Sequence, residues 1–165
     1  MIKIYTSYFY QIRNMEPGCL AFSTALSDPK YFHKFGDSSI KYFDKNGVLN
    51  GLRAEPFVPR FTEELKDPCT GPKGCKHLEN NLPWNCEFLE KYTELLSKLD
   101  SKDIEQRFIR VGENYLKEIG KDIPLTYILL VHEAPTNPCS ERGPLQKWLK
   151  ENDFGGEEWH EGKHS

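Results

Sequence analysis

The chain has 165 residues, of which 38% are hydrophobic and 28% charged, and its formal net charge at pH 7 is -3. This length suits one domain with a real core, and the apolar fraction excludes a disordered chain. The small negative charge gives no reason to expect general attraction to nucleic acid or to an anionic membrane. The chain begins MIKIYTSYF, without a charged segment followed by a long apolar run, and no stretch is apolar for long enough to span a membrane. We therefore expect a cytoplasmic protein with no membrane partner.

Three strands are predicted. Those at 2–8 and 19–24 are rich in β-branched and aromatic residues. The third, at 125–132, contains LTYILLV, which is apolar throughout and follows Pro124. Such a run is typical of a strand buried on both faces of a parallel sheet. We expect the three strands to be parallel and adjacent in one sheet.

Four helices are predicted, at 27–35, 85–100, 101–120 and 143–152. In the second and third, apolar residues recur at helical spacing along one face. Ser101 is placed to cap the third helix.

The segment 36–84 has no sustained helical or alternating period, and Gly, Pro, Asn and Asp recur in it every few residues. Irregular connections of this length are uncommon inside a domain and usually carry function or a metal. We expect one α/β domain at 1–154, with an irregular insertion at 36–84 and a frayed tail at 155–165.

The five cysteines are an odd number, which favours free thiols or metal ligands over a disulfide framework. Three thiols and one imidazole lie within eighteen residues of the insertion: Cys69, Cys75, His77 and Cys86. These donors form a tetrahedral zinc set, and a bound ion would stabilise a loop that has no core of its own. The spacing lacks the tight Cys-x2-Cys pair, so unligated thiols and a redox sensor stay open as alternatives. We predict zinc as the cofactor, and no organic cofactor.

Reactive side chains are concentrated between the third strand and the last helix: His132, Glu133, Cys139, Ser140 and Arg142. In open α/β sheets, ligands bind beyond the carboxyl ends of the strands, where loops lead into helices. The N–H groups and dipole at a helix start favour an anion and would increase the thiolate fraction of Cys139. Singly, Cys139 could be a small buried hydrophobe, Ser140 an N-cap and Arg142 a paired surface residue. Together they predict a site for something anionic.

Two segments carry a family resemblance: IYTSYFYQIRNM near the N-terminus, and HEAPTNPCSERGPLQKWL after the apolar strand. With the lengths between them, they resemble the bacterial and phage family described as domain of unknown function 488. In that family a Cys-His-Arg turn commonly opens the last helix, whereas this turn reads Cys139-Ser140-Glu141-Arg142, without the histidine and with one residue more. The resemblance covers most of the chain, most weakly at 36–83. It implies a three-layer Rossmann-like α/β fold with a short parallel sheet, and it implies no established activity.

The same resemblance implies that Tyr5, Thr6, Ser7 and Arg13, at the end of the first strand, lie beside the Cys139 turn. The Thr6 and Ser7 hydroxyls could donate to a phosphate or carboxylate, or could simply cap the strand. Arg53 is a further candidate for a phosphate-bearing ligand, with a solvated pair to Glu55 as the alternative.

Two functions follow from these residues. The first is an enzyme or binding protein for a nucleotide-like or other anionic small molecule. Cys139 would then be the nucleophile or polariser, Arg142 would bind the anion, and Glu133 or His132 would be the general acid or base. The alternative is a non-catalytic interaction module, whose zinc-stabilised insertion binds a protein or nucleic-acid partner.

Overall fold

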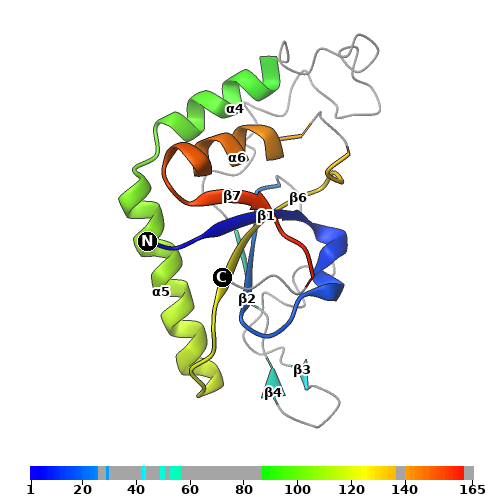
Figure 1. Ribbon diagram of the computed structural model, residues 1–165, viewed down its shortest axis with the longest axis vertical. Coiled ribbons are helices and arrows are strands. Elements are labelled where there is room, and N and C mark those ends of the chain that lie inside the picture. The colour runs from blue at the N-terminus through cyan, green and yellow to red at the C-terminus, as the bar shows by residue number, and fades with distance from the viewer. Residues whose placement is uncertain are drawn as a thin grey trace.

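The computed structural model describes residues 1–25, 29, 42–43, 49–50, 53–56, 87–136 and 140–161 (Figure 1). The elements in chain order are β1 (Ile4–Tyr8), η1 (Phe9–Asn14), β2 (Cys19–Ser23), β3 (Tyr42–Phe43), β4 (Leu49–Asn50), β5 (Arg53–Pro56), α4 (Glu87–Ser97), α5 (Ser101–Ile119), β6 (Thr126–Val131), α6 (Arg142–Glu151) and β7 (Gly155–Glu158). Within this part of the chain, no helix combines the length and apolar character needed to cross a membrane.

The main sheet has five strands in the order β5-β2-β6-β1-β7, and every pairing in it is parallel. Strand β6 is central and buried at every position, as its continuous apolar run predicts. The three predicted strands are confirmed in one parallel sheet, with β1 and β2 each paired to β6. The chain therefore has an α/β fold, and the finer Rossmann-like assignment stays a prediction.

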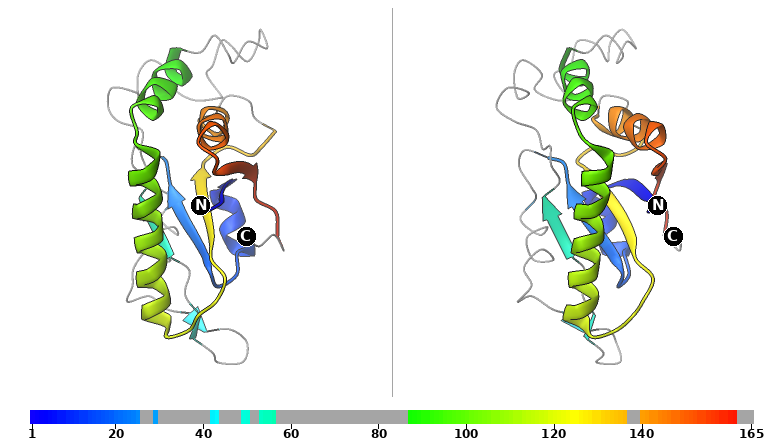
Figure 2. Two further views of the ribbon diagram at one scale, coloured as in Figure 1. Left: turned by 60° about the vertical axis from the view of Figure 1, so that its left-hand side comes forward. Right: turned by 90° about the vertical axis from the view of Figure 1, so that its left-hand side faces the viewer.

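The two faces of the sheet bury different sets of side chains. Tyr127, Leu129 and Val131 of β6 enter a core shared with α4, α5 and α6, whereas Ile128 and Leu130 enter a second core. Strand geometry explains this division, because successive side chains point to opposite faces. Figure 2 shows α5 along one face of the sheet and η1 on the opposite side.

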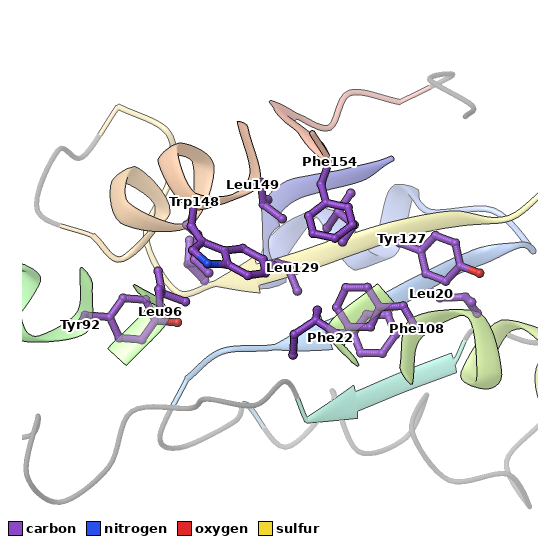
Figure 3. Close-up of a cluster of buried hydrophobic side chains, with 14 of the residues drawn as sticks. Leu20, Phe22, Tyr92, Leu96, Phe108, Tyr127, Leu129, Trp148, Leu149 and Phe154 are labelled. Atoms are coloured by element: carbon purple, nitrogen blue, oxygen red, sulfur yellow. The ribbon is translucent and has the colours of Figure 1, made fainter. Parts of the chain in front are cut away.

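Aromatic rings fill the core beneath the helices (Figure 3). The ring of Phe108 on α5 lies 4.3 Å from that of Phe22 and 5.9 Å from that of Tyr127, measured between centroids. Farther along the sheet, Trp148 on α6 lies 5.7 Å from Phe154. These contacts fix α5 and α6 against the strands, and so set where α6 begins.

Helix α5 begins after Asp100, whose side chain accepts a hydrogen bond from the Lys102 backbone N–H at 3.0 Å. Ser101, predicted as the cap, is instead the first helical residue. Gly120 ends the helix with a φ of 66°, a left-handed conformation that glycine adopts without steric cost. The helices at 85–100 and 143–152 correspond to α4 and α6, and the helix predicted at 27–35 lies outside the described residues apart from position 29.

The C-terminal segment is packed against the sheet, contrary to the prediction of a frayed tail. Gly155–Glu158 form β7, which pairs with β1, and Trp159 is buried in the second core. The Trp159 backbone N–H donates to the Thr6 carbonyl at 2.7 Å. The prediction is wrong for 155–161, because pairing with β1 and the burial of Trp159 hold this segment against the sheet. Residues 162–165 lie outside the described residues.

The predicted insertion at 36–84 lies mostly outside the described residues. The described part contains β3 and β4, which pair antiparallel, and β5, which pairs with β2 at the edge of the main sheet. At least one stretch of this segment therefore belongs to the sheet.

Alanine substitutions in β7 test whether the C-terminal segment is packed. Both glycines have positive φ, 91° at Gly155 and 76° at Gly156, so each alanine should cost about 1 kcal/mol in backbone strain. A Cβ at Gly156 would also lie 2.8 Å from the Gln146 carbonyl oxygen, whereas at Gly155 its nearest neighbour is a flexible lysine at 3.8 Å. We expect Gly156→Ala to lower the free energy of unfolding by roughly 1–3 kcal/mol more than Gly155→Ala, measured by urea denaturation. Equal, small effects would indicate that β7 is frayed.

Candidate functional site

A group of polar side chains gathers where the parallel strands end and α6 begins. Because parallel strands point the same way, their carboxyl ends share one edge of the sheet, the edge at which α/β proteins bind ligands. The β6 arrowhead in Figure 2 points toward α6 at this edge. We call this group the carboxyl-edge cluster and define it as Thr6, Thr24, Glu133, Glu141, Arg142, Gln146 and Glu158.

Arg142 connects the parts of this cluster. Its side chain is buried, and the residue is only 6% exposed. Its Nε donates to Glu158 Oε1 at 2.9 Å, its Nη2 donates to the Glu133 carbonyl oxygen at 2.7 Å, and its guanidinium lies 5.9 Å from the centre of the Tyr8 ring. Its Nη1 has no hydrogen-bond partner among the described residues. Arg142 is therefore a buried structural cation with one nitrogen, Nη1, that makes no hydrogen bond among the described residues, and the alternative of a paired surface residue is wrong.

Glu158 brings the end of β7 into the cluster. Besides the Arg142 bond, its Oε1 accepts from the Thr6 hydroxyl at 2.8 Å, and Gln146 Nε2 lies 3.5 Å away. Gln146 in turn donates to Thr6 Oγ1 at 2.8 Å. One carboxylate oxygen thus receives every contact, while Oε2 of Glu158 is buried without a partner in the described part of the chain.

Glu141 is a buried acid, 1% exposed, beside Thr24. Thr24 Oγ1 lies 2.9 Å from Glu141 Oε1 and 2.8 Å from the Leu130 carbonyl oxygen. The hydroxyl has one proton, so if it donates to the carbonyl, the second bond requires a proton on Glu141. Burial first, and the charge of Glu133 second, raise the pKa of Glu141 to about 8 against the weaker opposing effects of its own backbone, Thr24 and Arg142. Glu141 is therefore mainly a neutral acid at pH 7.

His132 and Glu133, the two residues after β6, occupy different surroundings. His132 is exposed, and its ring lies 4.8 Å from that of Phe9, measured between centroids, beside η1. Glu133 is half-buried, and its Oε2 has no hydrogen-bond partner among the described residues. Of the two predicted acid–base residues, Glu133 is the one that belongs to the cluster.

The predicted ligand-binding residues do not all lie in the cluster. Thr6 faces α6 within the cluster, whereas Ser7, one residue later on the strand, faces the other side of the sheet. Arg13 is exposed: its Nε donates to the Tyr10 carbonyl at 3.0 Å, and its guanidinium covers the Tyr10 ring at 3.7 Å. The geometry therefore brings Thr6, but not Ser7, together with Arg142.

Ser140 precedes the N-cap residue Glu141, and its Oγ accepts from the Arg142 backbone N–H at 3.1 Å. Pro144 has no N–H, so Gly143 is left as the one possible further backbone donor in the first turn of α6. Two of the positions at this helix start therefore offer no N–H to an anion, as Pro144 already indicates in the sequence, and anion binding here stays a prediction.

Other predicted site residues lie outside what the structure describes. They are Cys139, the side chain of Arg53, and the zinc set Cys69, Cys75, His77 and Cys86. Their roles, including the bound zinc, stay predictions.

Several cluster residues were missed by sequence reasoning. Gln146 follows Arg142 by one helical turn, so helical spacing could have placed both on one face. Glu141 was considered only as a surface partner of Arg142. Glu158 lies in the segment expected to fray, and Thr24 has no signal in the sequence beyond its place at the end of β2.

The cluster carries a surplus of negative charge. Arg142 and Glu158 form the ion pair and cancel, Glu141 is mainly neutral at pH 7, and Glu133 adds one negative charge. Each buried polar atom left without a partner costs about 1–3 kcal/mol. Buried polar atoms of this kind are usually met by a protein group, an ordered water or an ion.

Comparison of the chain with protein-family models, curated proteins and solved structures gave no match. The resemblance to the domain of unknown function 488 family stays a prediction.

Substituting Glu141 tests its protonation. The carboxyl keeps its proton to about pH 8 when folded but loses it near 4.5 when unfolded. Its contribution to stability is therefore full below pH 4.5 and is lost as the pH rises through 8. We expect Glu141→Gln to remove this loss, because the amide is neutral at every pH and can donate to Thr24.

The measurement is the free energy of urea unfolding at pH 5, 7 and 9. The difference between Glu141→Gln and wild type should grow in favour of the variant as the pH rises. Glu151→Gln, an exposed carboxylate on the same helix, is the matched control. A constant difference across this range would show that Glu141 is ionised in the folded protein.

Proposed function

We propose that the carboxyl-edge cluster binds a small polar molecule through an anionic or hydrogen-bond-accepting group that contacts Arg142. The observation that carries this proposal is Arg142 Nη1, a charged donor in a buried residue with no partner among the described residues. Proteins seldom leave such a donor unpaired, and a protein group, an ordered water or a ligand usually accepts from it. An acceptor on a ligand would complete the set of bonds that Nε and Nη2 already make.

The neighbouring carboxyl groups give this site the means for acid–base chemistry. The charge of Glu133 helps to raise the pKa of Glu141, and carboxyl groups with strongly perturbed pKa values are concentrated at catalytic sites. In our proposal Glu133 accepts a proton from the bound molecule. Glu141 is bonded to Thr24 and acts as a positioning residue. Cys139, between Glu133 and Ser140 in the chain, is proposed as the nucleophile if the protein is an enzyme.

Arg142→Lys is the variant suited to testing this site. Removing one partner of a buried ion pair is destabilising by about 3–5 kcal/mol. An Arg142→Ala variant could therefore lose binding because it unfolds, and not because it lacks the ligand contact. Lysine keeps the positive charge opposite Glu158 and removes the donor that Nη1 provides. It therefore separates the ligand contact from the structural charge.

We expect inorganic phosphate to shift the side-chain NMR resonances of the Arg142 Nε–H and the Gln146 amide. The resonance of Arg107, an exposed residue paired with Asp103, is the internal control. Arg142→Lys should weaken phosphate binding by about ten-fold or more, since a charge-assisted hydrogen bond contributes roughly 1.5–3 kcal/mol. If phosphate shifts Arg107 and Arg142 alike, or binds the variant as well as wild type, Arg142 is not the anion contact.

A further inference from the structure

We propose that the ligand of the carboxyl-edge cluster is a zwitterion, with an anionic group that contacts Arg142 and a cationic amino group that contacts the Glu133 carboxylate. This inference rests on the proposed function and narrows it to a chemical class. The class is small amino-bearing carboxylates or phosphates, rather than simple anions.

The first argument is the polarity of the unpartnered atoms. Within the described residues, the cluster contains three buried side-chain atoms without hydrogen bonds: Arg142 Nη1, Glu133 Oε2 and Glu158 Oε2. One of them donates and two accept. A simple anion can satisfy only the donor and would leave both carboxylate oxygens as they are. A ligand that also carries an amino group supplies the missing donors.

The second argument is the position of these groups. Arg142 Nη2 is bonded to the Glu133 carbonyl at 2.7 Å, so the unpartnered donor and the Glu133 carboxylate belong to residues in direct contact. The ion pairs among the described residues join Arg107 to Asp103 and Arg142 to Glu158. The Glu133 carboxylate is therefore not neutralised by Arg142. One small molecule could reach both residues.

The third argument is charge. The Arg142–Glu158 pair is neutral as a unit, and Glu133 leaves the site with one negative charge. A phosphate dianion would gain one contact to Arg142 and meet repulsion from Glu133 in a partly buried environment, where charges are weakly screened. An ammonium group on the same molecule converts that repulsion into a second attraction.

The test compares matched pairs of small molecules by isothermal titration calorimetry at pH 7. γ-Aminobutyrate and butyrate differ by the amino group, and so do O-phosphoethanolamine and ethyl phosphate. The two pairs distinguish a carboxylate from a phosphate as the anionic group. They are measured with wild type, with Glu133→Gln and with Glu151→Gln, whose exposed carboxylate on α6 is the matched control. A melting curve for each variant confirms that it is folded.

For at least one pair, we expect wild type to bind the amino-bearing molecule about ten-fold more tightly than its partner, as a charge-assisted contact implies. Glu133→Gln should bring this ratio close to one while retaining the anion, and Glu151→Gln should leave it unchanged. Equal binding of both members of each pair to wild type would overturn the zwitterion proposal and leave the Arg142 anion contact standing. Absence of binding by all four molecules at millimolar concentration would overturn both.

Discussion

The carboxyl edge of this fold depends on the compensation of one buried charge. Moving a guanidinium out of water costs several kcal/mol, and the cost is offset only when hydrogen bonds and an opposite charge meet it in good geometry. Arg142 is 6% exposed, and it is met by the Glu158 carboxylate and the Glu133 carbonyl. These partners come from β7 and from the turn after β6. The cation therefore links the start of α6 to the strands that precede and follow this helix in the chain.

The hydrogen bonds of Arg142 leave one of its nitrogens without a partner in the part of the chain that the structure describes, and this nitrogen is the basis for the proposed chemistry of the edge. A fold that needed Arg142 only as a structural link would be expected to pair all of its donors, yet Nη1 has no partner in the described residues. Nearby, Glu141 is enclosed between α6 and Thr24 and keeps its proton, in part because Glu133 is charged. A cation with a remaining donor, a charged carboxylate and a neutral acid thus lie within one group of residues. That combination is the basis for the proposed ligand.

Elements could be predicted from the sequence where their side chains repeat at one regular spacing and share one environment. LTYILLV is apolar apart from Thr126, which is typical of a central strand such as β6, and α5 presents apolar residues at helical spacing with Gly120 at its end. The features that the sequence did not predict are set by contacts with distant parts of the chain. Nothing local in Gly155–Glu158 indicates a strand, because its pairing depends on β1, and nothing local shows that Arg142 is buried, because burial depends on β7 covering α6. The candidate site predicted after β6 lies at the carboxyl edge of the sheet, but the burial of Arg142 and the raised pKa of Glu141 depend on packing that no short motif encodes.

The central claim is that Arg142 and Glu158 form a buried, stabilising pair that joins α6 to β7. A double-mutant cycle with Arg142→Met, Glu158→Gln and the double variant measures it most directly, through the free energy of urea unfolding. The account predicts a coupling energy above about 1.5 kcal/mol, because each single change leaves the other group buried without its partner. A coupling energy below about 0.5 kcal/mol, the magnitude of an exposed surface pair, would contradict it.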